Sequence, residues 1–127
     1  MPDPHWHAYT YGGSTYTDGQ IRRGAVPASY PPIEIKDWLT RPRDHIEGTF
    51  TEVEEAMSWL KIQLDLAPPV DAKSFPVDDR LDRARATLRQ TAGNDVVFGY
   101  YTGSRMYVSR ALIACPRPGM SCPERLS

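Results

Sequence analysis

The sequence predicts a single α+β domain with a mainly antiparallel sheet and two helices packed on one of its faces. Two amphipathic patterns of helical period, residues 51–66 and 76–92, precede two alternating stretches, residues 95–102 and 105–114. An alternating stretch at residues 5–11 adds a strand near the start. Helices and strands that are segregated along the chain are typical of the α+β class. A chain of 127 residues is long enough for one hydrophobic core.

The composition limits which kinds of partner the protein can bind and in which cellular compartment we expect it. The net charge of −1 argues against a general polyanion binder, because affinity for phosphate rests on clustered Lys and Arg. No apolar run approaches the length of a membrane span, and the first residues lack the features of a signal peptide, so we expect a soluble cytoplasmic protein. We expect flexible ends at residues 1–4 and 116–127. Cys115 and Cys122 flank a turn that can bring them together, and in a reducing cytosol two unpaired thiols are the favoured interpretation.

The region before residue 51 is rich in turn signals. The strand at residues 5–11 ends at two glycines, and after a second turn residues 20–26 can return as a short strand. Residues 27–48 contain four prolines, and we call this segment the wrap. We expect the wrap to be ordered, with a short strand at residues 33–36, because it carries apolar side chains that can attach it to the core: Ile33, Ile35, Trp38 and Leu39.

The first long helix, residues 51–66, begins with Thr51 and Glu54, which match a capping box, and two prolines end it. Its apolar residues fall on two nearly opposite sides. The main stripe faces the core, and a second stripe consists of Trp59, Ile62 and Leu66. The second stripe must be covered by the wrap or by another chain, and we favour the wrap.

The second helix, residues 76–92, has a narrow apolar stripe, and its acidic start and basic end indicate a solvated face. Gly93 is suited to its C-terminal stop.

A β-hairpin is predicted after the second helix, at residues 95–114. A two-residue loop at Gly103 and Ser104 predicts that Tyr100 pairs with Tyr107 and that Phe98 pairs with Ser109.

His5 and His7 form the clearest candidate for chemistry. Two residues apart on a strand, their imidazoles share one face and can reach one divalent metal. No third ligand is marked by its spacing, although His45, Glu34, Asp37 and the two cysteines remain possible. The interpretation that we favour is an aromatic surface or a hydrogen-bonded core edge, with no bound metal and no cofactor. No Ser or Cys nucleophile motif accompanies the histidines, so we assign no catalytic residue.

These observations favour a small non-catalytic accessory, regulatory or inhibitor protein that binds another macromolecule, with a protein as the expected partner and a monomer as the expected state. The candidate contact residues are Trp59, Ile62, Leu66, Trp38 and Tyr30. One alternative is a small enzyme or ligand-binding protein with a pocket lined by His5, His7, Tyr9 and Tyr11. A second alternative is RNA or DNA binding through the hairpin residues Tyr101, Arg105, Tyr107 and Arg110.

Overall fold

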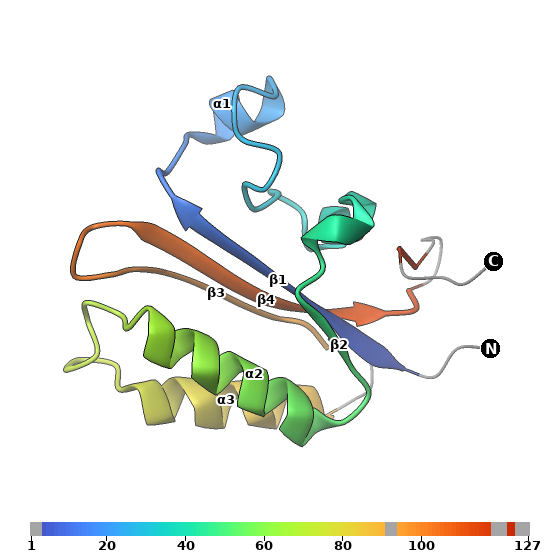
Figure 1. The fold of residues 1–127 in the computed structure, drawn as a ribbon, viewed down its shortest axis with the longest axis vertical. Coiled ribbons are helices and arrows are strands. Elements are labelled where there is room, and N and C mark those ends of the chain that lie inside the picture. Colours follow the sequence, from blue (N-terminus) through green and yellow to red (C-terminus); the bar gives the residue numbers. More distant parts are fainter. Residues whose placement is uncertain (1–3, 91–93, 118–121, 124–127) are drawn as a thin grey trace.

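A computed structural model describes residues 4–90, 94–117 and 122–123. Four antiparallel strands form one sheet in the order β2-β1-β4-β3, and two long helices, α2 and α3, lie on one face of it (Figure 1). The strands are β1 His5–Gly13, β2 Gly48–Phe50, β3 Val96–Tyr101 and β4 Tyr107–Cys115. The helices are α1 Asp18–Arg22, α2 Val53–Leu66 and α3 Val77–Gln90, with 3₁₀ helices η1 Ile35–Thr40 and η2 Arg43–His45. The predicted α+β class is confirmed.

The helix face of the sheet carries the larger apolar core. Leu60 of α2 and Leu88 of α3 are 0% and 2% exposed, which confirms that the main stripes of both helices point inward. They pack against side chains of the sheet that include Trp6, Val108 and Leu112. The predicted capping box at the start of α2 is not formed, because the N-cap is Glu52 and no side chain caps the helix. The predicted stop at Gly93 lies outside the described residues.

The wrap covers the opposite face of the sheet. Its 3₁₀ helix η1 places Trp38 against Tyr9 of β1 with ring centroids 5.0 Å apart, and Trp38 and Leu39 join a second core cluster with Ala111, Ile113 and Cys115. The strand predicted at residues 33–36 is therefore wrong. The strand predicted at residues 20–26 is also wrong, because Thr17 and Gln20 form a reciprocal capping box that starts α1.

The prediction that the wrap covers the outer stripe of α2 is wrong as well. The wrap lies on the sheet face away from the helices (Figure 1). Ile62 and Leu66 are 56% and 73% exposed, and Trp59 packs on Phe50 of β2 instead, with ring centroids 6.3 Å apart. Among the helices of the described residues, none is long and apolar enough to cross a membrane.

The hairpin register differs from the prediction by one residue. Tyr100 pairs with Val108, Tyr101 with Tyr107, and Phe98 with Arg110. The physical reason is a three-residue loop, in which the Thr102 amide donates to the Met106 carbonyl at 3.0 Å and Arg105 takes a left-handed conformation with φ 65°. A type I turn followed by a left-handed residue is the common geometry for this loop length. The slip changes which side chains share a face, because successive residues of a strand point to opposite sides.

Candidate metal centre

Two histidines and two cysteines meet on the wrap side of the sheet. They lie where β1 begins and β4 ends, and Figure 1 shows these two strand ends on the same side of the sheet. His5 pairs directly with Cys115 across β1 and β4, so their side chains share one face. His7 lies two residues further along β1, on the same face. Cys122, seven residues after the end of β4, contacts both imidazoles. We call these four residues the His/Cys cluster.

Three distances among His5, His7 and Cys122 are close to the edges of a tetrahedron around one metal ion. The Nε2 atoms of His5 and His7 are 3.2 Å apart, and Cys122 Sγ lies 3.0 Å from His7 Nε2 and 3.4 Å from His5 Nε2. With Cys115 Sγ included, the four candidate ligand atoms all lie within 4.8 Å of one another. Typical Zn–N and Zn–S bonds imply tetrahedral edges of about 3.3 Å between two nitrogens, about 3.6 Å between nitrogen and sulfur, and about 3.8 Å between two sulfurs.

A partner from β2 orients the buried His7. Its side chain is 0% exposed, and its Nδ1 lies 3.0 Å from the hydroxyl oxygen of Thr49, the residue that pairs with it across the two strands. When Nδ1 carries the proton and donates to Thr49, the lone pair of Nε2 faces the His/Cys cluster. Histidines that bind metals almost always hold the other ring nitrogen in such a hydrogen bond, which fixes the tautomer and the ring plane.

The two cysteines differ in environment. Burial raises the pKa of the Cys115 thiol to about 12, a hydrogen bond and the nearby charge of Cys122 act in the same direction, and Arg117 opposes them. Arg117 itself pairs with Asp95 at 2.7 Å, which holds the chain just beyond Cys115. Without a metal, Cys115 is therefore a neutral thiol at neutral pH. A bound metal ion would displace that proton, as it does whenever a thiol becomes a thiolate ligand.

A Cys–His dyad is the main alternative to a metal centre. Cys122, His7 and Thr49 match the order of nucleophile, base and orienting group, with the sulfur 3.0 Å from the imidazole nitrogen. This alternative uses neither His5 nor Cys115. Because both of these side chains also direct a ligand atom into the same small volume, a metal centre accounts for all four residues and a dyad for only two of them.

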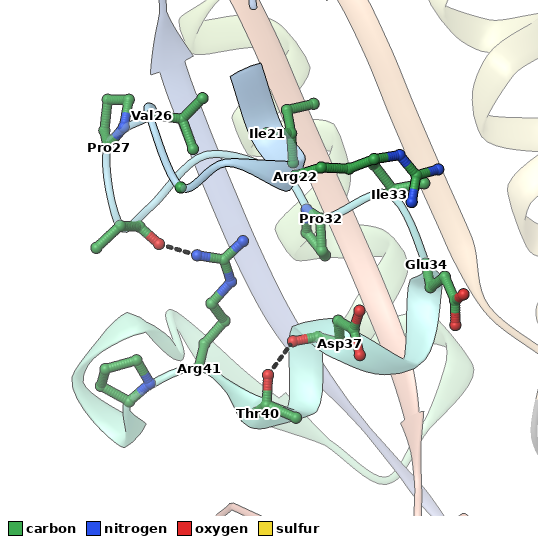
Figure 2. Close-up of a pocket in the computed structure, with 13 residues that line it drawn as sticks. Ile21, Arg22, Val26, Pro27, Pro32, Ile33, Glu34, Asp37, Thr40 and Arg41 are labelled. Carbon is green, nitrogen blue, oxygen red and sulfur yellow. Dashed lines mark hydrogen bonds between the residues drawn. The ribbon is translucent and has the colours of Figure 1, made fainter. Parts of the chain in front are cut away.

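A pocket of about 710 Å³ lies between the wrap and the segment of α1, and no residue of the His/Cys cluster lines it (Figure 2). Arg41, one of the charged residues that line it, donates to the backbone carbonyls of Ala28 and Tyr30, and the hydroxyl of Thr40 donates to the Asp37 carbonyl at 2.7 Å. These groups hold the wrap in its shape. We therefore assign the pocket a structural role and place the candidate site at the His/Cys cluster.

The four residues of the predicted ligand pocket lie on one face of β1. His5 and His7 belong to the His/Cys cluster. Tyr9 and Tyr11 are 1% and 6% exposed: Tyr9 stacks on Trp38, and the hydroxyl of Tyr11 donates to the Ser14 carbonyl at 2.8 Å. The structure thus separates the two histidines, which meet the cysteines, from the two tyrosines, which the wrap covers.

The other predicted site residues are scattered. Trp38 and Tyr30 are 3% and 6% exposed and pack within the chain, whereas Ile62 and Leu66 of the outer α2 stripe are exposed and Trp59 is half-buried. The predicted nucleic-acid residues divide between both sides of the hairpin and its turn. Arg110 pairs with Phe98 on the helix face, Tyr107 pairs with Tyr101 on the opposite face, and Arg105 lies in the turn.

Sequence reasoning left the third and fourth ligands of the His/Cys cluster open. The usable signal was the position of His5 and Cys115 at the ends of two alternating stretches, which an antiparallel pairing of those stretches would bring together. Comparison of the chain with protein-family models, curated proteins and solved structures found no match. Any function must therefore be argued from the geometry of the site.

Proposed function

We propose that this chain is a zinc-binding protein in which His5, His7, Cys115 and Cys122 hold one Zn²⁺ ion. The observation that carries the proposal is the convergence of four nitrogen and sulfur ligand atoms within 4.8 Å, from parts of the chain more than a hundred residues apart. Two sulfurs and two imidazole nitrogens in a tetrahedral arrangement are the donor set of structural zinc sites.

The role of the zinc is structural. Four protein ligands fill the tetrahedral coordination and leave no position for a substrate or an activated water, which a catalytic zinc site keeps open. The proposal therefore agrees with the expectation of a non-catalytic protein. It also replaces the expectation of no metal, which rested on the lack of a marked third ligand. Binding of a protein partner through Ile62 and Leu66 stays a prediction.

The metal would join three parts of the fold. His5 and His7 belong to β1, Cys115 ends β4, and Cys122 lies in the segment that follows β4. Because β1 and β4 are the two central strands of the sheet, a metal at this position ties the C-terminal segment to the most buried part of the domain. Binding energy at such a site adds directly to the free energy of folding.

Metal analysis of protein expressed without a histidine tag tests the proposal. We expect one zinc ion per chain in the wild type, and loss of the zinc in both the His5→Ala/His7→Ala double variant and the Cys122→Ser variant. His45→Ala is the matched control, because it removes the third histidine, which lies outside the His/Cys cluster. The control must keep its zinc. Wild-type protein that takes up no zinc when refolded with excess Zn²⁺ would overturn the proposal.

A further inference from the structure

The His/Cys cluster contains the only two cysteines of the chain, and both offer their sulfur to the same point. We infer that this site is a redox switch: a peroxide oxidises Cys115 and Cys122 to a disulfide, and the zinc is released. The inference rests on the proposed zinc binding and adds its regulation. Its first support is distance. The two Sγ atoms lie within 4.8 Å of each other, and Cys122 packs against the core cluster that contains Cys115, so each sulfur is already the other's neighbour.

The burial of the two sulfurs sets the order of the reaction. Cys122 is partly exposed, whereas Cys115 is 2% exposed. The Cys122 thiolate therefore meets the peroxide first, attacks one oxygen and breaks the O–O bond, which gives a Cys122 sulfenic acid and hydroxide. The Cys115 thiolate then attacks the Cys122 sulfur, the S–S bond forms and a second hydroxide leaves. Two protons from solvent convert both hydroxides to water, so two thiolates are oxidised by two electrons and one hydrogen peroxide is reduced to two waters.

Oxidation removes half of the donor set. A disulfide sulfur carries no negative charge and is a poor zinc ligand, because the thiolate is the form of cysteine that binds metals. His5 and His7 would then be the remaining ligands. Two imidazoles are fewer than the three or four protein ligands that zinc sites use. Loss of the thiolates therefore releases the ion.

The surroundings of the two cysteines favour closure of the disulfide over further oxidation. The ion pair between Arg117 and Asp95 holds the chain next to Cys115, and the contact of Cys122 with His5 and His7 holds the other sulfur on the same face. A sulfenic acid on Cys122 thus forms beside a second sulfur that can resolve it. A neighbouring resolving cysteine is the arrangement by which sulfenic acids are protected from sulfinic acid formation.

Peroxide treatment of zinc-loaded, untagged protein tests the inference. A chromogenic chelator measures released zinc, and the mass of the intact chain measures the oxidation. We expect release of the one zinc ion together with a loss of about 2 Da, which marks a disulfide. Peptide mapping should join Cys115 to Cys122, and a thiol reductant followed by Zn²⁺ should restore the zinc content. Zinc retained under peroxide, or a gain of oxygen atoms on Cys122 with no link to Cys115, would overturn the inference.

A Cys122→His variant provides the matched control. It offers three imidazoles and one thiolate, a donor set that holds zinc, but only one sulfur. We expect this variant to keep its zinc under conditions that empty the wild type, and equal release from both proteins would contradict the switch. If the variant binds no zinc, the switch is tested by the wild-type protein alone, through its mass after oxidation and the peptide map of its cysteines. Absence of zinc before the oxidant is added defeats the proposed function, whereas zinc that is bound and not released defeats only the switch.

Discussion

The two faces of the sheet are closed in different ways. On the helix face, α2 and α3 bury apolar side chains that recur at helical spacing, and the buried charged side chain of α3, Arg80, pairs with Asp71. On the wrap face, 3₁₀ helices and irregular chain cover β1 and β4, and the buried groups there include His7 and Cys115. Regular elements thus hide one face mainly with apolar contacts. The irregular cover leaves sulfur and imidazole groups at one end, where a metal ion can join them.

This comparison predicts that mutations on the two faces have different consequences for zinc. Trp38→Ala should have the largest effect on stability, about 3–5 kcal/mol, because a buried aromatic side chain is removed from the wrap face. Trp38 also shares its cluster with Cys115, so we expect weaker zinc binding in the same variant. Chemical denaturation and zinc titration measure the two effects. An unchanged zinc affinity would show that the wrap and the His/Cys cluster are independent.

The buried side chains of the helix face could be predicted from the sequence more fully than those of the wrap face, and the reason is physical. Apolar residues at helical spacing placed Leu60 and Leu88 inward without any tertiary information. The wrap has no period, so the sequence could not show that Trp38 packs on Tyr9 instead of on α2. In the hairpin, Arg105 takes the left-handed conformation and the loop is one residue longer than predicted. Glycine adopts this conformation most readily, so the sequence favoured Gly103 for it and gave no reason to expect it at Arg105.

Two of the four residues of the candidate site could be predicted from the sequence to lie together. His5 and His7 stood out because two residues on one strand must share a face. Cys115 joined them through the pairing of β1 with β4, a contact between residues 110 positions apart that local spacing does not encode. Cys122, which belongs to no described strand or helix, joined them through its contacts with both imidazoles. Ligands that depend on such long-range contacts become visible only when the topology is known.

Leu60→Ala should lower stability by about 2–5 kcal/mol through the cavity that it leaves in the helix-face core. In contrast to Trp38→Ala, it should leave the zinc affinity of the native protein unchanged, because Leu60 lies on the face away from the His/Cys cluster. Ile62→Ala, on the exposed side of the same helix, is the matched control and should change stability by less than about 0.5 kcal/mol. A loss of zinc affinity in Leu60→Ala would contradict the separation of the two faces.

Glu54→Gln should have the smallest effect, and only on the helix face. A hydrogen bond from Arg85, together with the charges of Arg85 and Arg89, holds the pKa of Glu54 below its ordinary value, and desolvation of the carboxyl acts in the opposite direction. A carboxyl with a lowered pKa in the folded state stabilises the fold above its unfolded pKa, and this contribution disappears as the pH falls through the folded pKa. Thermal melting should therefore show a small difference between wild type and Glu54→Gln at neutral pH that vanishes in acid. A difference that grows in acid would contradict this assignment.

X-ray absorption spectroscopy at the zinc edge, on untagged protein, tests the central claim most directly because it counts the ligands and identifies their elements. The His/Cys cluster predicts four ligands, two nitrogens at about 2.0 Å and two sulfurs at about 2.3 Å. The imidazole ring should add the outer-shell scattering that a histidine ligand produces, and Cys122→Ser should remove one sulfur or the metal itself. A spectrum with nitrogen and oxygen ligands alone would contradict the account, since both cysteines would then lie outside the coordination sphere.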